Sequence, residues 1–159
     1  MKHLQNYINE KLIITKDKAK NKYAYSCQPQ KWGDLRNILE DRLEKDKDAD
    51  LNDIDVTKIT DMSDIFRTLD PHNIDISEWD VSNVTNTEGM FYGCKNFNSD
   101  LSNWDVSNVK YMFRMFSNCQ KFDSDLSNWD VSNVEDMKNI FDGCYALKHV
   151  PTWYLNHFK

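Results

Sequence analysis

Glycine, proline and long apolar runs are scarce in this sequence, and each shortage excludes a class of protein. Four glycines and three prolines in 159 residues are too few for a collagen-like or linker-type chain. No apolar run approaches the roughly 18 residues that cross a bilayer, so no membrane span is predicted. Phosphate loops, nucleophile elbows and the CxxC and HExxH spacings are also missing. We therefore predict a soluble, non-enzymatic protein with no cofactor and no metal site.

Targeting signals are missing as well. The opening residues 1–11 contain no uninterrupted apolar stretch and no small-residue cleavage site, and no lipidation motif is present. This favours a cytoplasmic or virion-associated location over the cell surface. Without export the four cysteines are expected to be free thiols, and Cys94, Cys119 and Cys144 are expected to pack as small core residues.

Charge is divided unevenly along the chain. Residues 1–50 carry 11 basic and 9 acidic side chains, whereas residues 51–150 carry 8 basic and 17 acidic ones. A surface that negative repels phosphate backbones, which argues against nucleic acid as a ligand. The charge favours a protein partner with basic side chains.

Residues 51–150 consist of four consecutive units of 25 residues, which begin at Leu51, Ile76, Leu101 and Leu126. Aligned without gaps, the units place apolar side chains in seven columns with one polar exception, Thr87. A fixed period of this length indicates a stack of structural repeats that bury their apolar edges against one another. The columns are Ile54/Trp79/Trp104/Trp129, Val56/Val81/Val106/Val131, Ile59/Val84/Val109/Val134, Met62/Thr87/Met112/Met137, Ile65/Met90/Met115/Ile140, Phe66/Phe91/Phe116/Phe141 and Leu69/Cys94/Cys119/Cys144.

Two spacings occur within each unit. Trp104 and Val106 are two residues apart, as in a strand. The apolar residues from Val109 to Cys119 are instead separated by three residues or by one, as on one face of a helix. Each unit is therefore predicted to be a short strand followed by a short helix or 3₁₀ turn, with the strands in a parallel sheet. The serines between the two parts are predicted helix N-caps, with Glu135 completing a capping box in the last unit. These serines are Ser82, Ser107 and Ser132.

The motif carried by the third and fourth units resembles that of a known family. It reads Cys119-x-x-Phe122, Trp129-x-Val131 and Val134-x-x-Met137-x-x-Ile140-Phe141-x-x-Cys144. This pattern is similar to the BspA-like leucine-rich repeats, which also occur in mycoplasma lipoprotein-associated surface proteins. The resemblance implies an α/β leucine-rich-repeat-like solenoid whose relatives are mostly bacterial surface or adhesion proteins that bind other proteins.

Caps are expected at both ends of the repeats, because an end unit otherwise exposes a slice of core. Residues 23–50 form the predicted N-terminal cap, with a short strand at Tyr23–Cys27 and an amphipathic helix over 34–45. Residues 151–159 form the aromatic C-terminal cap. The helix directs Leu35, Ile38, Leu39 and Leu43 inward, and the aromatic cap uses Val150, Trp153, Tyr154 and Phe158.

Residues 1–22 are predicted to be an amphipathic arm followed by a charged linker. Leu4, Tyr7, Ile8 and Leu12 share one helical face. The arm either folds back on the cap or docks into a groove of another protein. Its opening resembles the amino termini of proteins from phages of gut bacteria, which would make the chain a structural or virion-associated component.

An acidic column is the most prominent polar feature of the repeats. Asp55, Asp80, Asp105 and Asp130 lie between two inward columns and are predicted to point outward, where like charges on neighbouring units repel. Three interactions could offset this repulsion: hydrogen bonds within local turns, a partner presenting Lys or Arg, or Ca²⁺ bound between carboxylates. The predicted partner-binding residues are Glu78, Asp80, Asn103, Asp105, Asn128 and Asp130.

Three functions follow as hypotheses. The favoured one is a non-enzymatic protein-interaction module that binds a partner through this acidic face. The alternatives are a phage structural component that docks through its N-terminal arm and a calcium-stabilised bacterial surface adhesin.

Overall fold

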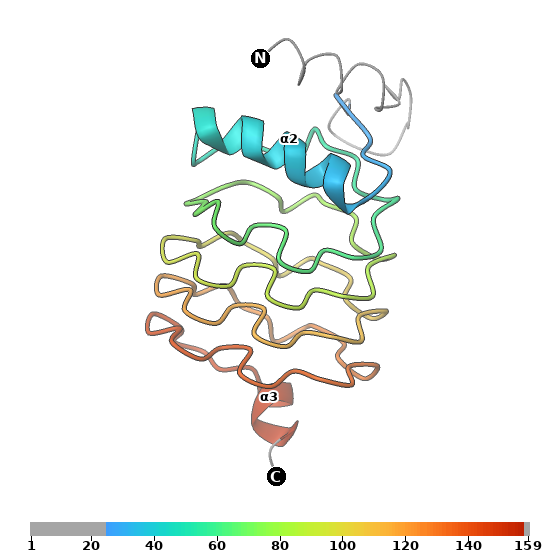
Figure 1. The fold of residues 1–159 in the computed structure, drawn as a ribbon. Coiled ribbons are helices and arrows are strands. Elements are labelled where there is room, and N and C mark those ends of the chain that lie inside the picture. The colour runs from blue at the N-terminus through green and yellow to red at the C-terminus, as the bar shows by residue number, and fades with distance from the viewer. Residues whose placement is uncertain (1–24, 158–159) are drawn as a thin grey trace.

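The computed structural model describes residues 25–157, which form a stack of coils with a helix at each end (Figure 1). Helix α2 spans Trp32–Lys45 and helix α3 spans Thr152–His157. Between them the chain winds through four coils that coincide with the 25-residue units of the sequence. We number them coil 1 (residues 51–75), coil 2 (76–100), coil 3 (101–125) and coil 4 (126–150).

The prediction of an α/β leucine-rich-repeat solenoid is wrong. Within residues 25–157 the only helices are α2 and α3, and the repeats contain no strand, only isolated parallel bridges such as those joining Asn86 to Asp61 and Tyr111. Each coil is instead a chain of tight turns. Where a strand was predicted, the N–H of Trp79 donates to the carbonyl of Ile76, three residues earlier.

Short polar side chains explain why no strand forms. The Oδ1 atom of Asp80 accepts the Ser82 N–H at 3.1 Å, and that of Asp75 accepts the Ser77 N–H at 3.1 Å. Aspartate and asparagine that bond to an amide two residues on offer the backbone an alternative to a strand ladder. The predicted serine N-caps are therefore wrong too, since Ser82, Ser107 and Ser132 donate to such turns.

Left-handed backbone explains why no helix forms in the second half of a coil. Asp64, Gly89, Arg114 and Asn139 are equivalent in the four coils, and their φ angles lie between 52° and 58°. A second column with positive φ lies four residues later, and an α-helix does not continue through either position. The second column is Thr68, Gly93, Asn118 and Gly143.

Alternate backbone amides in this half of each coil join it to the next coil. In coil 3 the N–H groups of four residues donate to carbonyls of coil 4. Between them, the N–H groups of Met115 and Ser117 turn back to carbonyls three residues earlier. Coil 2 is joined to coil 3 in the same way. We call these inter-coil bonds the N–H ladder. In coil 3 it consists of Met112 to Asp136 (2.8 Å), Arg114 to Lys138 (3.1 Å), Phe116 to Ile140 (3.0 Å) and Asn118 to Asp142 (2.6 Å).

Aromatic columns fill the core. Trp79 and Trp104 are stacked with centroids 6.4 Å apart, and Phe91 and Phe116 with centroids 5.6 Å apart. The predicted inward position of the tryptophans is confirmed, because Trp79, Trp104 and Trp129 are each 4% exposed. The Nε1–H of Trp104 donates to the Ile76 carbonyl at 3.0 Å, which satisfies the buried indole.

Helix α2 covers coil 1, as the apolar spacing over residues 34–45 predicted. Leu35, Ile38, Leu39 and Leu43 are buried, whereas Glu40 is exposed. Of the strand predicted before this helix, the described part is a single bridge between Cys27 and Ile54. The arm residues Leu4, Tyr7, Ile8 and Leu12, together with Tyr23 and Phe158, lie outside the described residues.

Helix α3 covers part of coil 4. Trp153 extends the tryptophan column, 6.4 Å from Trp129 and donating to the Leu126 carbonyl, and Tyr154 meets Phe141 edge-on. Phe141, Cys144 and other coil 4 side chains are nevertheless only partly buried. The C-terminal end of the stack is less completely covered than the N-terminal end.

Candidate functional site

The predicted partner-binding residues lie on the exposed surface of the coils. We call Glu78, Asp80, Asn103, Asp105, Asn128 and Asp130 the acidic turn face, and all six are exposed. In coils 2, 3 and 4 it lies on the turn that replaces the predicted strand. The Oδ1 atom of Asp105 accepts the backbone N–H of Ser107 at 3.0 Å and its hydroxyl at 2.6 Å, and Asp80 and Ser82 make the same pair of bonds.

Local hydrogen bonds favour the ionised form of Asp105 and Asp130. The hydroxyl and then the backbone N–H of Ser107 lower the pKa of Asp105, against smaller opposing effects that include the charge of Asp130. The pKa of Asp130 is lowered first by the backbone N–H of Ser132 and then by its hydroxyl. Hydrogen bonds to the charged form of a carboxyl favour that form. The turns therefore offset the repulsion that the sequence predicted.

Asp55 departs from its column. It is only 1% exposed, which contradicts its predicted outward position. The segment before α2 lies over it: the Asp55 N–H donates to the Cys27 carbonyl, and Gln28 Nε2 donates to Asp55 Oδ2 at 2.5 Å. The acidic turn face thus begins at coil 2.

A polar groove of about 590 Å³ adjoins the acidic turn face, lined by residues 98–100 of coil 2, by Ser102 and residues 123–125 of coil 3, and by Asn128 of coil 4. It shares Asn128 with that face and contains a second column of turn-forming aspartates, represented by Asp100 and Asp125. Ser127 hydrogen bonds lower the pKa of Asp125, and Lys148 hydrogen bonds lower that of Asp123. Sequence reasoning missed this groove, although the period that singled out Asp105 also aligns Asp100 with Asp125.

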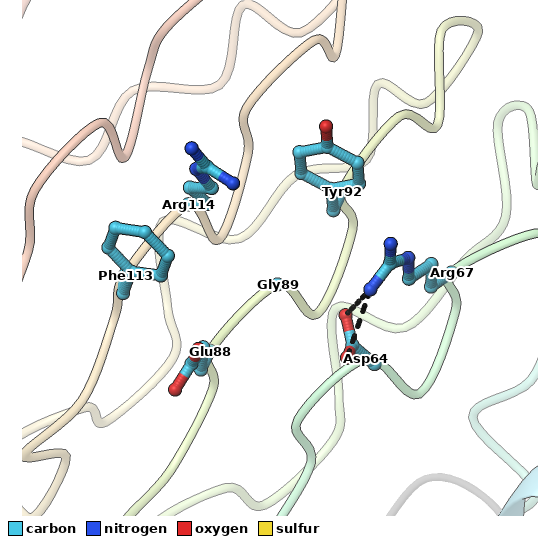
Figure 2. A pocket seen from close by; sticks show the side chains of 7 residues that line it. All are labelled: Asp64, Arg67, Glu88, Gly89, Tyr92, Phe113 and Arg114. Atoms are coloured by element: carbon cyan, nitrogen blue, oxygen red, sulfur yellow. Dashed lines mark hydrogen bonds and ion pairs between the residues drawn. The ribbon is translucent and has the colours of Figure 1, made fainter.

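A second hollow, of about 140 Å³, lies among coils 1, 2 and 3 (Figure 2). Arg67 pairs with Asp64 at 3.4 Å and stands over the Tyr92 ring, 5.1 Å from its centroid. Arg114 stands over the Phe113 ring at 4.9 Å, and no acidic group among residues 25–157 forms an ion pair with it. Its guanidinium can therefore donate hydrogen bonds to a carboxylate from outside the chain.

Gly89 shapes this hollow. Its φ is 58°, and a Cβ placed on it would approach Asp64 Oδ1 to 2.4 Å. Sequence reasoning missed this site, because the aligned positions that line it carry different residue types in each unit: Asp64, Gly89 and Arg114 share one column, and Arg67 and Tyr92 share another.

The three repeated thiols are not a reactive site. All four cysteines are free, and Cys94 and Cys119 are buried, which confirms their prediction as core residues, while Cys144 is half-buried. Burial raises the pKa of Cys94 and of Cys144 to about 12, and it raises that of Cys119 as well. Thiols with such values stay protonated and unreactive at neutral pH.

The part of the chain that the structure describes holds no group of three His, Cys, Asp or Glu side chains placed to bind a metal ion. Neither α2 nor α3 is long and apolar enough to span a membrane.

Comparison with known proteins places this stack of coils in a family. The family model described as "Mycoplasma protein of unknown function, DUF285" matches residues 34–153, which run from α2 through all four coils into α3. The chain belongs to this family. The match does not carry the finer assignment to BspA-like leucine-rich repeats. No curated protein and no solved structure shows significant similarity to the chain.

Proposed function

We propose that the protein is a non-enzymatic interaction module that binds basic side chains of a protein partner through the acidic turn face. The observation that carries the proposal is the way each carboxylate is held. Oδ1 is bound by the turn, whereas Oδ2 of Asp80 and of Asp105 meets no donor among residues 25–157. An anchored carboxylate with one open oxygen is preorganised for a lysine or arginine.

The groove beside the face supports a partner that inserts side chains. Asp100 and Asp125 line it, and Asn128 joins it to the acidic turn face. Basic side chains that enter a lined hollow lose more water than those on a flat surface, and such contacts contribute more to affinity. The remaining hypotheses, docking through the N-terminal arm and stabilisation by calcium, stay predictions.

Charge-neutral variants test the proposal. Asp80→Asn, Asp105→Asn and Asp130→Asn in one protein keep an Oδ1 acceptor for each turn and remove three charges. The matched control is Glu44→Gln, Glu88→Gln and Asp142→Asn, which removes three charges from exposed side chains outside the face. Quantitative affinity capture from an extract of the source organism compares both variants with the parent.

The expected result is a defined set of proteins that the parent and the control retain and the acidic-face variant loses. Captured proteins should also elute as salt is raised, because exposed charge pairs are screened. Equal capture by all three proteins, or equal loss from both variants, overturns the proposal.

A further inference from the structure

The N–H ladder ends at coil 4 with its donors unused. Met137, Asn139, Phe141 and Gly143 are the coil 4 equivalents of the four ladder donors in coil 3. In the part of the chain that the structure describes, their N–H groups have no acceptor. An unpaired row of backbone donors is a template for another polypeptide.

The carbonyls beside these donors are already occupied. The Met137 carbonyl accepts the Ile140 N–H, the Asn139 carbonyl that of Asp142, and the Phe141 carbonyl that of Cys144. The row from 137 to 143 therefore offers donors alone; of the four donor residues Asn139 is exposed, Phe141 and Gly143 are half-buried, and Met137 is buried. Its partner must supply carbonyl groups at alternate residues.

Helix α3 does not pair with this row. Its Trp153 and Tyr154 contact the rings of Trp129 and Phe141, but no α3 carbonyl accepts a bond from the row. The side chains around the row reflect the incomplete cover. Val134, Phe141, Cys144 and Leu147 are partly buried, whereas their coil 3 equivalents Val109, Phe116, Cys119 and Phe122 are fully buried.

The chain itself shows what fits such an edge. Coil 4 presents the carbonyls of Asp136, Lys138, Ile140 and Asp142 to coil 3, and the Glu135 N–H donates back to the Lys110 carbonyl at 2.8 Å. Coil 3 presents the equivalent groups to coil 2. The complementary occupant is a segment of about eight residues that runs parallel to residues 135–143.

A second copy of the chain does not supply that segment. Its own coil 4 edge offers N–H groups, which cannot pair with other N–H groups. Its coil 1 is covered by α2 and by the segment that bridges Cys27 to Ile54. We propose that the coil 4 edge binds an extended segment of another protein that follows the apolar pattern of residues 134–144 and accepts the unused ladder bonds. This site is distinct from the acidic turn face.

The test uses a synthetic peptide with the sequence of residues 134–144, carrying Cys144→Ser, and a scrambled peptide as control. Amide hydrogen exchange of the full, isotope-labelled chain is followed by NMR with and without unlabelled peptide. Saturating peptide is expected to slow exchange at Asn139, Phe141 and Gly143 by roughly tenfold or more. Exchange at Arg114 and Phe116, whose amides are already bonded, should not change.

A pair of variants at Asn139 links binding to the edge. Asn139 has a φ of 58°, so Asn139→Gly keeps the backbone and should bind the peptide like the parent. Asn139→Val disfavours that conformation and should weaken binding roughly tenfold, while the coil 2 and coil 3 spectra show that the stack remains folded.

Three outcomes overturn this proposal: no slowing at the highest soluble peptide concentration, equal slowing by the scrambled peptide, or slowing that already occurs without peptide as protein concentration rises. The last would identify a second copy as the occupant. Because the acidic-face variant keeps the whole edge, it should bind the peptide normally, so failure here is distinguishable from failure of the acidic-face proposal.

Discussion

At the scale of single residues, hydrogen bonds from serine lower the pKa of three turn aspartates, Asp105, Asp125 and Asp130. The hydroxyl of Ser107 is the largest cause of the lowered pKa of Asp105, whereas the backbone N–H of Ser132 is the largest cause for Asp130. A substitution to alanine removes the hydroxyl and keeps the N–H. The two positions therefore form a matched pair.

Ser107→Ala is expected to raise the pKa of Asp105 further than Ser132→Ala raises that of Asp130. A folded-state pKa below the unfolded value means that the stabilisation is complete above about pH 4 and is lost as pH falls through the folded pKa. In Ser107→Ala the folded pKa moves towards the unfolded value, so the acid loss should be smaller and should be complete at a higher pH. NMR titration of the carboxyl carbons measures both pKa values. An unchanged pKa of Asp105 in Ser107→Ala would show that the Ser107 hydroxyl does not lower it.

Glycine substitutions separate backbone conformation from packing. Gly89 and Gly93 have φ angles of 58° and 74°, whereas Gly33 lies in α2 with nothing within 4 Å of an added Cβ. We expect Gly89→Ala and Gly93→Ala each to lower the free energy of unfolding by about 1–2 kcal/mol. Gly33→Ala should raise it by about 0.5–1 kcal/mol.

Urea unfolding measures the three changes. Gly93 separates backbone strain from steric clash. A Cβ at Gly93 meets nothing within 4 Å, whereas a Cβ at Gly89 meets the movable Asp64 carboxylate. Similar losses at both positions are expected if left-handed backbone dominates. A gain at Gly93 would contradict that explanation.

At the scale of the coils, burial decides how much each core position contributes. Phe116 is stacked between Phe91 and Phe141 and is fully buried, whereas Phe141 is partly buried beside α3. Phe116→Ala should cost about 3–5 kcal/mol of unfolding free energy, and Phe141→Ala roughly half as much. Chemical denaturation of both variants checks the order, and equal losses would show that coil 4 is as well covered as coil 3.

The coils also show how far the sequence predicts this fold. The 25-residue period identified the buried columns, and the spacing of Leu35, Leu39 and Leu43 identified α2. The type of secondary structure was wrong because an apolar spacing does not reveal whether backbone amides bond along or between coils. That choice depends on side chains such as Asp80, which binds its own turn, and on left-handed residues such as Arg114.

The candidate site was predictable to a similar extent. Alignment of the units located the acidic turn face, because its members repeat with the core. It could not show that Asp55 is buried, since Gln28 covers it from outside the repeats. The hollow that contains Arg67 and Arg114 was unpredictable because its columns do not repeat a residue type: Arg114 is aligned with Gly89, and Arg67 with Tyr92.

At the scale of the whole molecule, the stack is expected to open from coil 4. Repeats that contact only their neighbours unfold most readily where one neighbour is missing. Cys144 lies in coil 4 and is half-buried, whereas Cys94 and Cys119 lie in inner coils and are buried. A thiol reagent at neutral pH should therefore modify Cys144 before the other two.

Mass spectrometry of partly modified protein gives the order. The raised pKa values keep all three thiols protonated, so modification reports opening and not intrinsic reactivity. Adding the 134–144 peptide should slow modification of Cys144 alone. Equal rates at the three cysteines would mean that the stack opens as one unit.

The hydrogen bonds between coils allow this architecture to lengthen by one 25-residue repeat at a time. Trp104 donates to a carbonyl 28 residues earlier and Phe116 to one 24 residues later, and the same offsets recur from one coil to the next. Duplicating a block of 25 codons would thus insert one coil that can make the same hydrogen bonds to the coil before it and to the coil after it. Adding or deleting a single codon inside a coil would instead shift the register of its bonds to both neighbours. Gene length in such a lineage should change by whole layers, with the terminal helices carried along unchanged.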